Sequence, residues 1–352
     1  FQSIKIICLF MYLFYVCLFL MTDMYNKKPL STEALTGEVD KGSEILSLPA
    51  RIDRYGKAKT RQVEILDHID AKLQEPNPDG LRFHLSETKR ASIKHCGEFL
   101  RFANYYTVGK VRLTHANFCK THLLCPLCAI RRGSKQVKAY LDKLDLILKE
   151  KPHLKLHMVT LTVKNGSDLG ERFDHLQKSF KKLLKARRNS LAGKSSTVMG
   201  KLTGGVYSYE ATYSKEHGWH PHVHMAVLCH KDDPLIVDKR NPKESQLSRE
   251  WYKATGDSFI VESHEVYGEQ SLAFIEVFKY ALKFSDLTPD QTLQSYITLK
   301  GRRLTGAFGD FWGVKVPEEL TDEALDDLPY IEMFYRFSGK QYQLHSSKQK
   351  CA

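Results

Sequence analysis

Four cysteines clustered between residues 96 and 128 constrain the fold of this chain more than any other sequence feature. The four are Cys96, Cys119, Cys125 and Cys128. The CPLC run presents two thiolates in a tight turn, and four thiolates form the shell that a structural zinc ion prefers. His95, His115 and His122 lie near enough in sequence for each to replace one sulfur. We therefore predict a Cys-rich, zinc-knuckle-like element that binds Zn²⁺, rather than four buried free thiols.

Beyond the cysteines, runs with strand character alternate with runs of helical spacing. β-branched and apolar runs predict strands over 157–163, 205–213, 222–229 and 259–266. Apolar residues at helical spacing predict helices over 137–148, 168–188, 247–254 and 271–284. Strands joined by hairpins and by crossing helices are typical of an α+β fold. We expect an antiparallel central sheet with flanking helices, preceded by the cysteine element.

The run HVH places two histidines on one face of a predicted strand. His222 and His224 are two residues apart, so both imidazoles point the same way and can share one divalent ion. Glu210 lies on the preceding strand, and a hairpin would bring its carboxylate beside them. Two nitrogens and one carboxylate suit Mg²⁺ or Mn²⁺ at a phosphate. His220 is the alternative third ligand, and two ordinary surface or core histidines are the alternative to a metal site.

A tyrosine follows a glutamate at helical spacing in the last predicted helix. Glu276 and Tyr280 are four residues apart and share a helix face, and Lys283 lies three residues further on the same side. A phenol with a pKa of about 10 is a poor nucleophile at neutral pH. A metal at the phosphate and a nearby ammonium group would stabilise both the phenolate and the transition state. The alternative is a tyrosine that only packs.

The charge balance favours a polyanionic partner. Lys and Arg number 53 against 41 Asp and Glu, which gives a net charge of +12, and nucleic acid is the commonest partner of such a protein. Arg131 and Arg132 directly follow the cysteines, and Lys181 and Lys185 lie on the helix predicted over 168–188. We expect these four side chains to contact DNA, although a basic run is also typical of a solvated helix face.

The motifs occur in an order that resembles one family: the replication initiators of small rolling-circle plasmids from Gram-positive bacteria, in the HUH endonuclease superfamily. The resemblance extends from about Cys96 to Gly313. Its segments are FCKTHLLCPLCAIRR, VTLT, EATY, GWHPHVHMAVL, WYKATGDS, EVFKYALKFSD and LKGRRLTGAFGDFWG. The hydrophobic run at residues 1–21 departs from the family pattern.

This resemblance implies a function and a role for each site residue. His222 and His224 would hold the metal, and Tyr280 would attack a scissile phosphate at the double-strand origin of plasmid DNA, single-stranded at the nick. The freed 3′-OH would prime a host polymerase, with a host helicase as a further partner. Glu276 would activate water at termination. The protein is expected in the cytoplasm.

Five regions are expected along the chain. They are a hydrophobic segment at 1–21, a leader region with a short helix at 22–90, the cysteine module at 91–133, the HUH nickase domain at 134–315 and a C-terminal tail at 316–352. For 1–21, we favour a true translation start at Met21 or Met24, which would leave this segment out of the protein, over a membrane anchor, because a full span needs about 20 apolar residues. Two alternative functions remain open: an HUH transposase or relaxase, and a zinc-containing DNA-binding regulator that does not nick.

Overall fold

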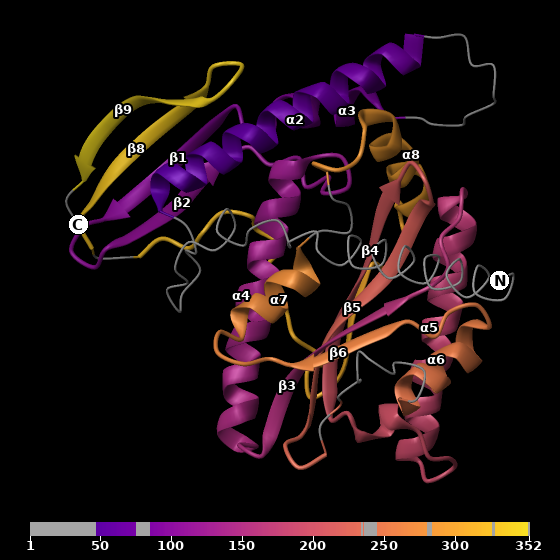
Figure 1. Cartoon of the computed structure of the whole chain (residues 1–352). Coiled ribbons are helices and arrows are strands. Elements are labelled where there is room, and N and C mark those ends of the chain that lie inside the picture. The colour runs from indigo at the N-terminus through magenta and orange to yellow at the C-terminus, as the bar shows by residue number, and fades with distance from the viewer. Residues whose placement is uncertain are drawn as a thin grey trace, which may run out of the picture. The chain divides into compact units, whose positions relative to one another are not determined.

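The chain folds into two antiparallel sheets with helices packed against them (Figure 1). The computed structural model describes residues 47–74, 85–233, 235, 245–279, 284–325 and 328–350. The α+β class predicted from the sequence is confirmed. The sheet arrangement differs from the expected single central sheet, because a second sheet accompanies the cysteine element.

The larger sheet has five strands in the order β6-β3-β5-β4-β7. Their bounds are β3 Leu154–Thr162, β4 Gly204–Ser214, β5 Gly218–His230, β6 Val261–Glu265 and β7 Thr305–Gly309. The strands predicted from β-branched and apolar runs are β3, β4, β5 and β6. The short strand β7 pairs with β4 and was not predicted. Its sequence TGAFG contains two glycines, which weaken any strand pattern.

Helices cover both faces of this sheet. One face packs against α4 (Pro126–Glu150) and α7 (Ser271–Phe278), where the rings of Tyr140 and Phe278 stack with centroids 5.0 Å apart. On the other face, Phe180 of α5 (Leu169–Leu191) contacts Tyr209 edge-on, 5.9 Å between centroids. Helices α6 (Gln246–Thr255) and α8 (Pro289–Leu299) pack against α5, as does the short 3₁₀ helix η2 (Val198–Lys201). Because successive side chains of a strand point to opposite faces of the sheet, a separate hydrophobic core forms on each face.

The smaller sheet has four strands in the order β2-β1-β8-β9. It joins two hairpins from distant parts of the chain: β1 Phe99–Tyr105 with β2 Lys110–Ala116, and β8 Tyr330–Phe337 with β9 Tyr342–Lys350. The region expected as a C-terminal tail thus contains two paired strands. Strand β9 is exposed along nearly its whole length, so its sequence lacks the apolar alternation by which a strand is recognised.

The leader region contains a long helix rather than a short one. Helix α2 (Leu48–Gln74) is followed by α3 (Glu87–Lys94), which begins at the N-cap Ser86. Lys59 of α2 donates a hydrogen bond to the carbonyl of Lys94, 2.8 Å away, so the helix packs against the cysteine-bearing segment. Among the described helices, none combines the length and apolar composition that crossing a membrane requires. Segment 1–21 lies outside the described residues.

Candidate active site and cysteine cluster

The hairpin of β4 and β5 brings the predicted carboxylate and histidines together. In its register Glu210 stands opposite His222, and Ser208 stands opposite His224. Cross-strand partners share a face, and residues two apart on one strand do too. The three side chains therefore project from one face, the same face that α7 covers. Gly218 begins β5 with φ of +75°, a conformation that favours glycine.

The ligand atoms of these three residues converge on one point. The Oε2 atom of Glu210 lies 3.0 Å from Nε2 of His224 and 3.3 Å from Nε2 of His222. All three residues are buried, Glu210 with an exposed fraction of only 1%. Among the described residues, Glu210, His222 and His224 form one of two groups of His, Cys, Asp or Glu that could hold a metal ion. The Nδ1 atom of His220 instead hydrogen-bonds with the side-chain oxygen of Asn165.

The orientation of the two imidazoles fits a cation. Nδ1 of His222 lies 3.1 Å from the carbonyl oxygen of His220, which can only accept, so Nδ1 carries the proton. In the neutral ring Nε2 then presents a lone pair toward the carboxylate of Glu210. Two acceptors facing each other require a positive charge between them or on the ring. Nδ1 of His224 lies 3.1 Å from Oγ1 of Thr160, a second contact that orients a ring.

The neighbours of Glu210 also favour its ionised form. Burial would raise the pKa of its carboxyl, but hydrogen bonds and charge from His222 and His224 hold that pKa well below its usual range. The buried carboxylate is thus kept ionised, as a metal ligand must be.

Helix α7 places a second carboxylate at the edge of this group. Oε1 of Glu276 lies 3.7 Å from Nε2 of His224, and Oε2 lies 2.7 Å from Nζ of Lys279. The side chain of Glu276 is 39% exposed, whereas that of His224 is 10% exposed. Glu276 therefore faces the solvent side of the site. Tyr280 and Lys283, predicted as nucleophile and supporting cation, lie outside the described residues.

A glycine in α4 allows α7 to approach this closely. A Cβ atom on Gly133 would lie 2.7 Å from the carbonyl oxygen of Phe278, a distance that forces backbone to move. At the other side of α7, the hydroxyl of Ser208 donates to the carbonyl of Val277. The C-terminal end of α7 is therefore held between α4 and β4.

The four cysteines form the second candidate metal group. Sγ of Cys96 lies 3.6 Å from Sγ of Cys125 and 3.5 Å from Sγ of Cys128, and Cys119 lies 3.6 Å from Cys128. A tetrahedral ion with metal–sulfur bonds of about 2.3 Å would separate its sulfurs by about 3.8 Å, so the spacing fits such an ion. All four cysteines are buried. Hydrogen bonds from the other thiols lower the pKa of Cys119, whereas burial raises that of Cys125.

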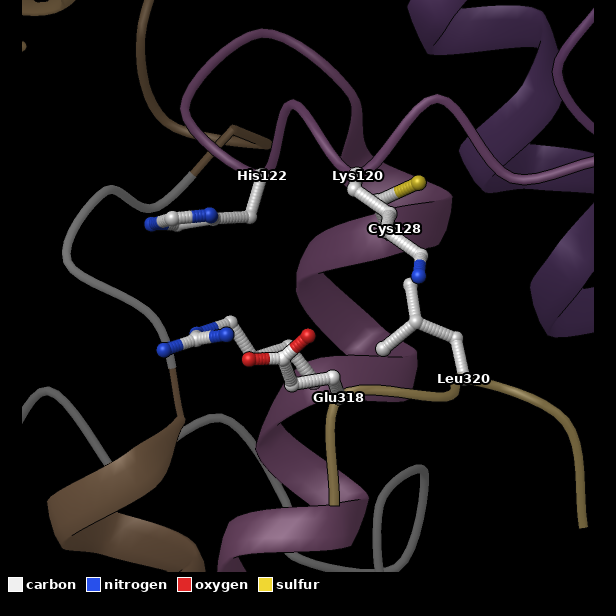
Figure 2. Close-up of a pocket in the computed structure, with 6 residues that line it drawn as sticks. Lys120, His122, Cys128, Glu318 and Leu320 are labelled. Carbon is white, nitrogen blue, oxygen red and sulfur yellow. The ribbon is translucent and has the colours of Figure 1, made fainter. Parts of the chain in front are cut away.

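The nearby histidines are not part of this group. His95 is exposed and pairs with Glu98 through Nδ1, 2.7 Å from Oε1. His115 is exposed on β2. His122 lines a hollow beside Cys128, in which Lys120 and Glu318 also lie (Figure 2). The four-sulfur set is therefore the one that the fold brings together.

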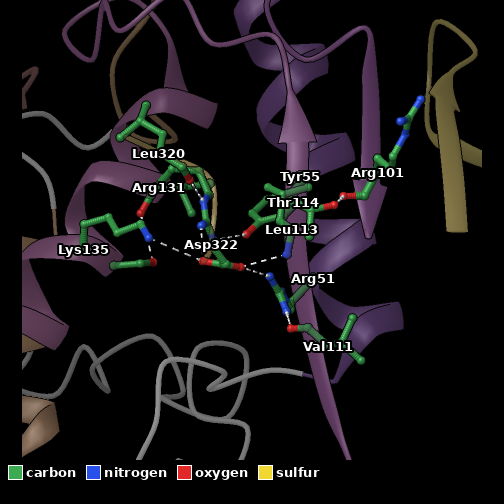
Figure 3. Close-up of polar contacts among 12 residues, drawn as sticks. Arg51, Tyr55, Arg101, Val111, Leu113, Thr114, Arg131, Lys135, Leu320 and Asp322 are labelled. Atoms are coloured by element: carbon green, nitrogen blue, oxygen red, sulfur yellow. Dashed lines mark hydrogen bonds and ion pairs between the residues drawn. The ribbon is translucent and has the colours of Figure 1, made fainter. Parts of the chain in front are cut away.

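Arg131 is a correction to the predicted DNA contacts. It is 3% exposed, and its guanidinium donates to the carbonyl of Leu320 (2.7 Å), the hydroxyl of Tyr55 (3.2 Å) and the carboxylate of Asp322 (2.5 Å). Asp322 in turn accepts a hydrogen bond from the amide of Leu113, 2.8 Å away (Figure 3). Because this interior network occupies its donors, Arg131 cannot reach a DNA phosphate.

The other three predicted DNA-contacting cations remain accessible. Arg132 is exposed and lines the same hollow as His122. Lys181 and Lys185 are exposed on α5. Their role in DNA binding stays a prediction.

Two orienting residues were not singled out from the sequence. Thr160 contacts His224, and Asn165 contacts His220. A signal for Thr160 existed in the run VTLT, because Thr160 and Thr162 share one face of β3, and β3 pairs with β5 so that they stand opposite His224 and His222.

Comparisons with known proteins agree with these features. Residues 110–333 match a family described as replication protein. A Protein rep of Streptococcus pneumoniae serotype 2 is 30% identical over 255 residues, which cover 69% of this chain and 76% of that relative. A Protein rep of Lentilactobacillus hilgardii is 30% identical over 59% of this chain and 66% of its own length. A Protein rep of Bacillus amyloliquefaciens is 25% identical over 69% of this chain and 77% of its own length.

The chain therefore belongs to the replication protein family. Membership confirms the resemblance to the replication initiators of Gram-positive plasmids that the ordered motifs indicate. No solved structure matches the chain.

Proposed function

We propose that this replication protein nicks one strand of a plasmid double-strand origin through a phosphotyrosine intermediate and so starts rolling-circle replication. The observation that carries the proposal is the convergence of Glu210, His222 and His224 beside Glu276 in a member of this family. Two nitrogens and one carboxylate leave positions open for a phosphate oxygen, unlike a closed structural site.

Glu210, His222 and His224 would hold Mg²⁺ or Mn²⁺. When bound, such an ion polarises the scissile phosphate and favours attack on it. The chain contributes the rigidity of the site. The backbone carbonyl of His220 and the hydroxyl of Thr160 hold the two imidazoles in the required orientation.

Tyr280 would be the nucleophile, two residues beyond the end of α7 at Phe278. Its phenolate oxygen forms a bond to the scissile phosphorus, the bond from phosphorus to the 3′ oxygen breaks, and that oxygen takes up a proton to become the 3′-OH. The 5′ phosphate stays joined to the tyrosine. Lys283 would stabilise the phenolate.

Glu276 would act at the end of replication as a general base. Its position on the solvent side of His224 suits a carboxylate that accepts a proton from water as that water attacks a phosphate. The final cleavage would then release DNA without a second covalent adduct. Lys279, 2.7 Å from the same carboxylate, holds it in place.

The remaining assignments concern binding. The four cysteines would hold a structural Zn²⁺. Arg132, Lys181 and Lys185 would contact phosphates of plasmid DNA, and a host helicase and polymerase would act after the nick in the cytoplasm.

The proposal is tested with supercoiled DNA that carries the origin, incubated with protein and Mn²⁺ or Mg²⁺. The wild type is expected to yield open circles and protein-linked DNA, and Tyr280→Phe is expected to yield neither. The matched control is Tyr252→Phe, an exposed tyrosine on α6. If Tyr280→Phe nicks and links DNA as the control does, the mechanism is wrong.

A further inference from the structure

One face of the four-stranded sheet is buried. On the other face, Ala103 and Tyr105 at one end are also buried, and there the Tyr105 hydroxyl accepts a hydrogen bond from the amide of Leu325, but the rest of this face is at least partly accessible. Leu100 and Phe102 lie on the buried face, where the guanidinium of Arg51 from α2 stands 5.3 Å from the Phe102 ring centroid. Arg101, between them, belongs to the opposite face and points away from the Asp322 network (Figure 3). We call this second face the open face.

Aromatic rings occupy the middle of the open face. Phe334 stands opposite Arg101 in the register of β1 and β8. Its ring lies 5.7 Å from that of Phe99 and 5.9 Å from that of His345 on β9. Phe99 and Phe334 are half-buried, and His345 is exposed. Within the described residues, the rings of Phe99 and Phe334 contact each other, and that of Phe334 also contacts His345 and Arg101 of the same sheet.

The same face is strongly basic. The strand registers place six cations on it: Arg101, Lys110, Arg112, Arg336, Lys348 and Lys350. One carboxylate, that of Glu332, lies among them, 3.9 Å from the Arg101 guanidinium. Arg101 and Arg112 are half-buried, and the other four cations are exposed. The guanidinium of Arg101 also lies 5.7 Å from the Phe334 ring centroid, so cation and ring form one surface.

Rings set among cations on an open sheet suit one class of ligand. Unpaired bases stack on aromatic rings, while the phosphates between them are attracted to the surrounding cations. A duplex keeps its bases inside the stack and offers only phosphates to such a surface. An acidic protein would use the cations but leave the rings exposed to water.

We propose that the open face binds single-stranded DNA, with bases stacked on Phe99 and Phe334 and phosphates near Arg336 and Lys348. The inference rests on the proposed function only in that origin nicking supplies a single strand to bind. The surface belongs to a different sheet from the candidate active site, so binding and nicking are separately measurable.

The test measures binding of a labelled oligothymidylate of about 16 nucleotides by fluorescence anisotropy. All proteins carry Tyr280→Phe so that no covalent adduct forms, and no Mg²⁺ or Mn²⁺ is added. Phe334→Leu keeps an apolar side chain but removes the ring, and Phe334→Tyr restores a ring. We expect about tenfold weaker binding for the leucine variant and a change of no more than about twofold for the tyrosine variant.

A second pair of variants tests the charges. Arg336→Gln with Lys348→Gln is expected to weaken binding and to reduce the slope of log K against log salt by about 1.4, since each phosphate contact contributes about 0.7 on a single strand. Lys149→Gln with Lys253→Gln removes two exposed cations from α4 and α6 and serves as the control. Thermal melting of each variant checks that it folds. If Phe334→Leu does not fold, the Arg336→Gln, Lys348→Gln variant alone tests whether the open face binds single-stranded DNA.

The outcomes separate this inference from the proposed function. It is overturned if the open-face variants bind oligothymidylate as tightly as the control pair, or if duplex DNA of equal length competes equally and loses the same affinity in Phe334→Leu. Origin nicking by the protein with Tyr280 intact is scored separately. A chain that nicks but shows no open-face effect refutes this inference alone, and a chain that shows the effect but does not nick refutes the proposed function alone.

Discussion

The cysteine cluster and the group of Glu210, His222 and His224 differ in whether a metal ion held there would have a position open for a substrate. The cysteine cluster brings together four buried sulfurs from loops and from the first turn of α4. The hairpin group brings together three ligand atoms and has Glu276 at its solvent side. A full set of four ligands is typical of a structural site, and three with an open position are typical of catalysis. The number of ligand atoms that converge, rather than burial, separates the two groups.

The largest expected effect tests the structural half of this comparison. Cys125→Ala removes one of four sulfurs and should abolish zinc binding, which is worth on the order of 10 kcal/mol in small zinc modules. We expect the cooperative melting of the cysteine-bearing part to be lost, as measured by calorimetry together with metal analysis. Cys229→Ala, a buried cysteine on β5 away from the cluster, is the control. Equal zinc content and equal melting in both variants would refute a structural metal.

The next effect tests the catalytic half. His224→Ala should reduce origin nicking on the order of a thousandfold, because a metal at the phosphate contributes several kcal/mol to the transition state. The melting temperature should change far less than in Cys125→Ala. His217→Ala, in the exposed turn between β4 and β5, should nick normally. A His224→Ala protein that nicks at the control rate, or that unfolds as Cys125→Ala does, would erase the distinction between the two groups.

The smallest effect concerns the stability that the buried ion pair of Arg131 and Asp322 adds to the part of the chain around the cysteine cluster. Asp322→Asn leaves the buried guanidinium of Arg131 without its carboxylate and should lower the free energy of unfolding by about 3 kcal/mol at pH 7. Asp142→Asn, which breaks an exposed pair with Lys138, should lower it by about 0.5 kcal/mol or less. Urea denaturation measures both.

The pH dependence of this effect has a definite sign. Burial would raise the pKa of Asp322, but the charges of Arg131 and Arg51 and two hydrogen bonds hold it below its ordinary value. A depressed pKa adds stability above the unfolded value of about 4, and this stability is lost as the pH falls through the folded value. The difference between wild type and Asp322→Asn should therefore shrink below pH 4. A constant difference across that range would show that the ionised carboxylate is not the cause.

Local pattern was sufficient for the parts of the fold that alternate with helices. Strands β3, β4 and β5 follow from β-branched runs, and the hairpin that joins β4 to β5 is enough to place Glu210 opposite His222. The clustering of the cysteines likewise followed from their spacing. The metals and the catalytic roles of these residues stay predictions.

Long-range pairing was beyond the reach of the sequence. The partner that buries Arg131 is Asp322, 191 residues away, so the arginine looked like a surface cation beside a knuckle. Strand β9 is recognisable only once β8 lies beside it, and β8 itself pairs with β1 from the other end of the chain. Charge and exposure of such residues depend on neighbours that no local pattern contains.

The close approach at Gly133 sets helix propensity against packing. Alanine is favoured over glycine inside an isolated helix by about 1 kcal/mol. At this position of α4, however, the methyl group would displace the carbonyl of Phe278, and with it the helix end that carries Glu276 and leads to Tyr280. Overpacking of this kind costs about 1–3 kcal/mol, so the same methyl group would disturb both the scaffold and the candidate site.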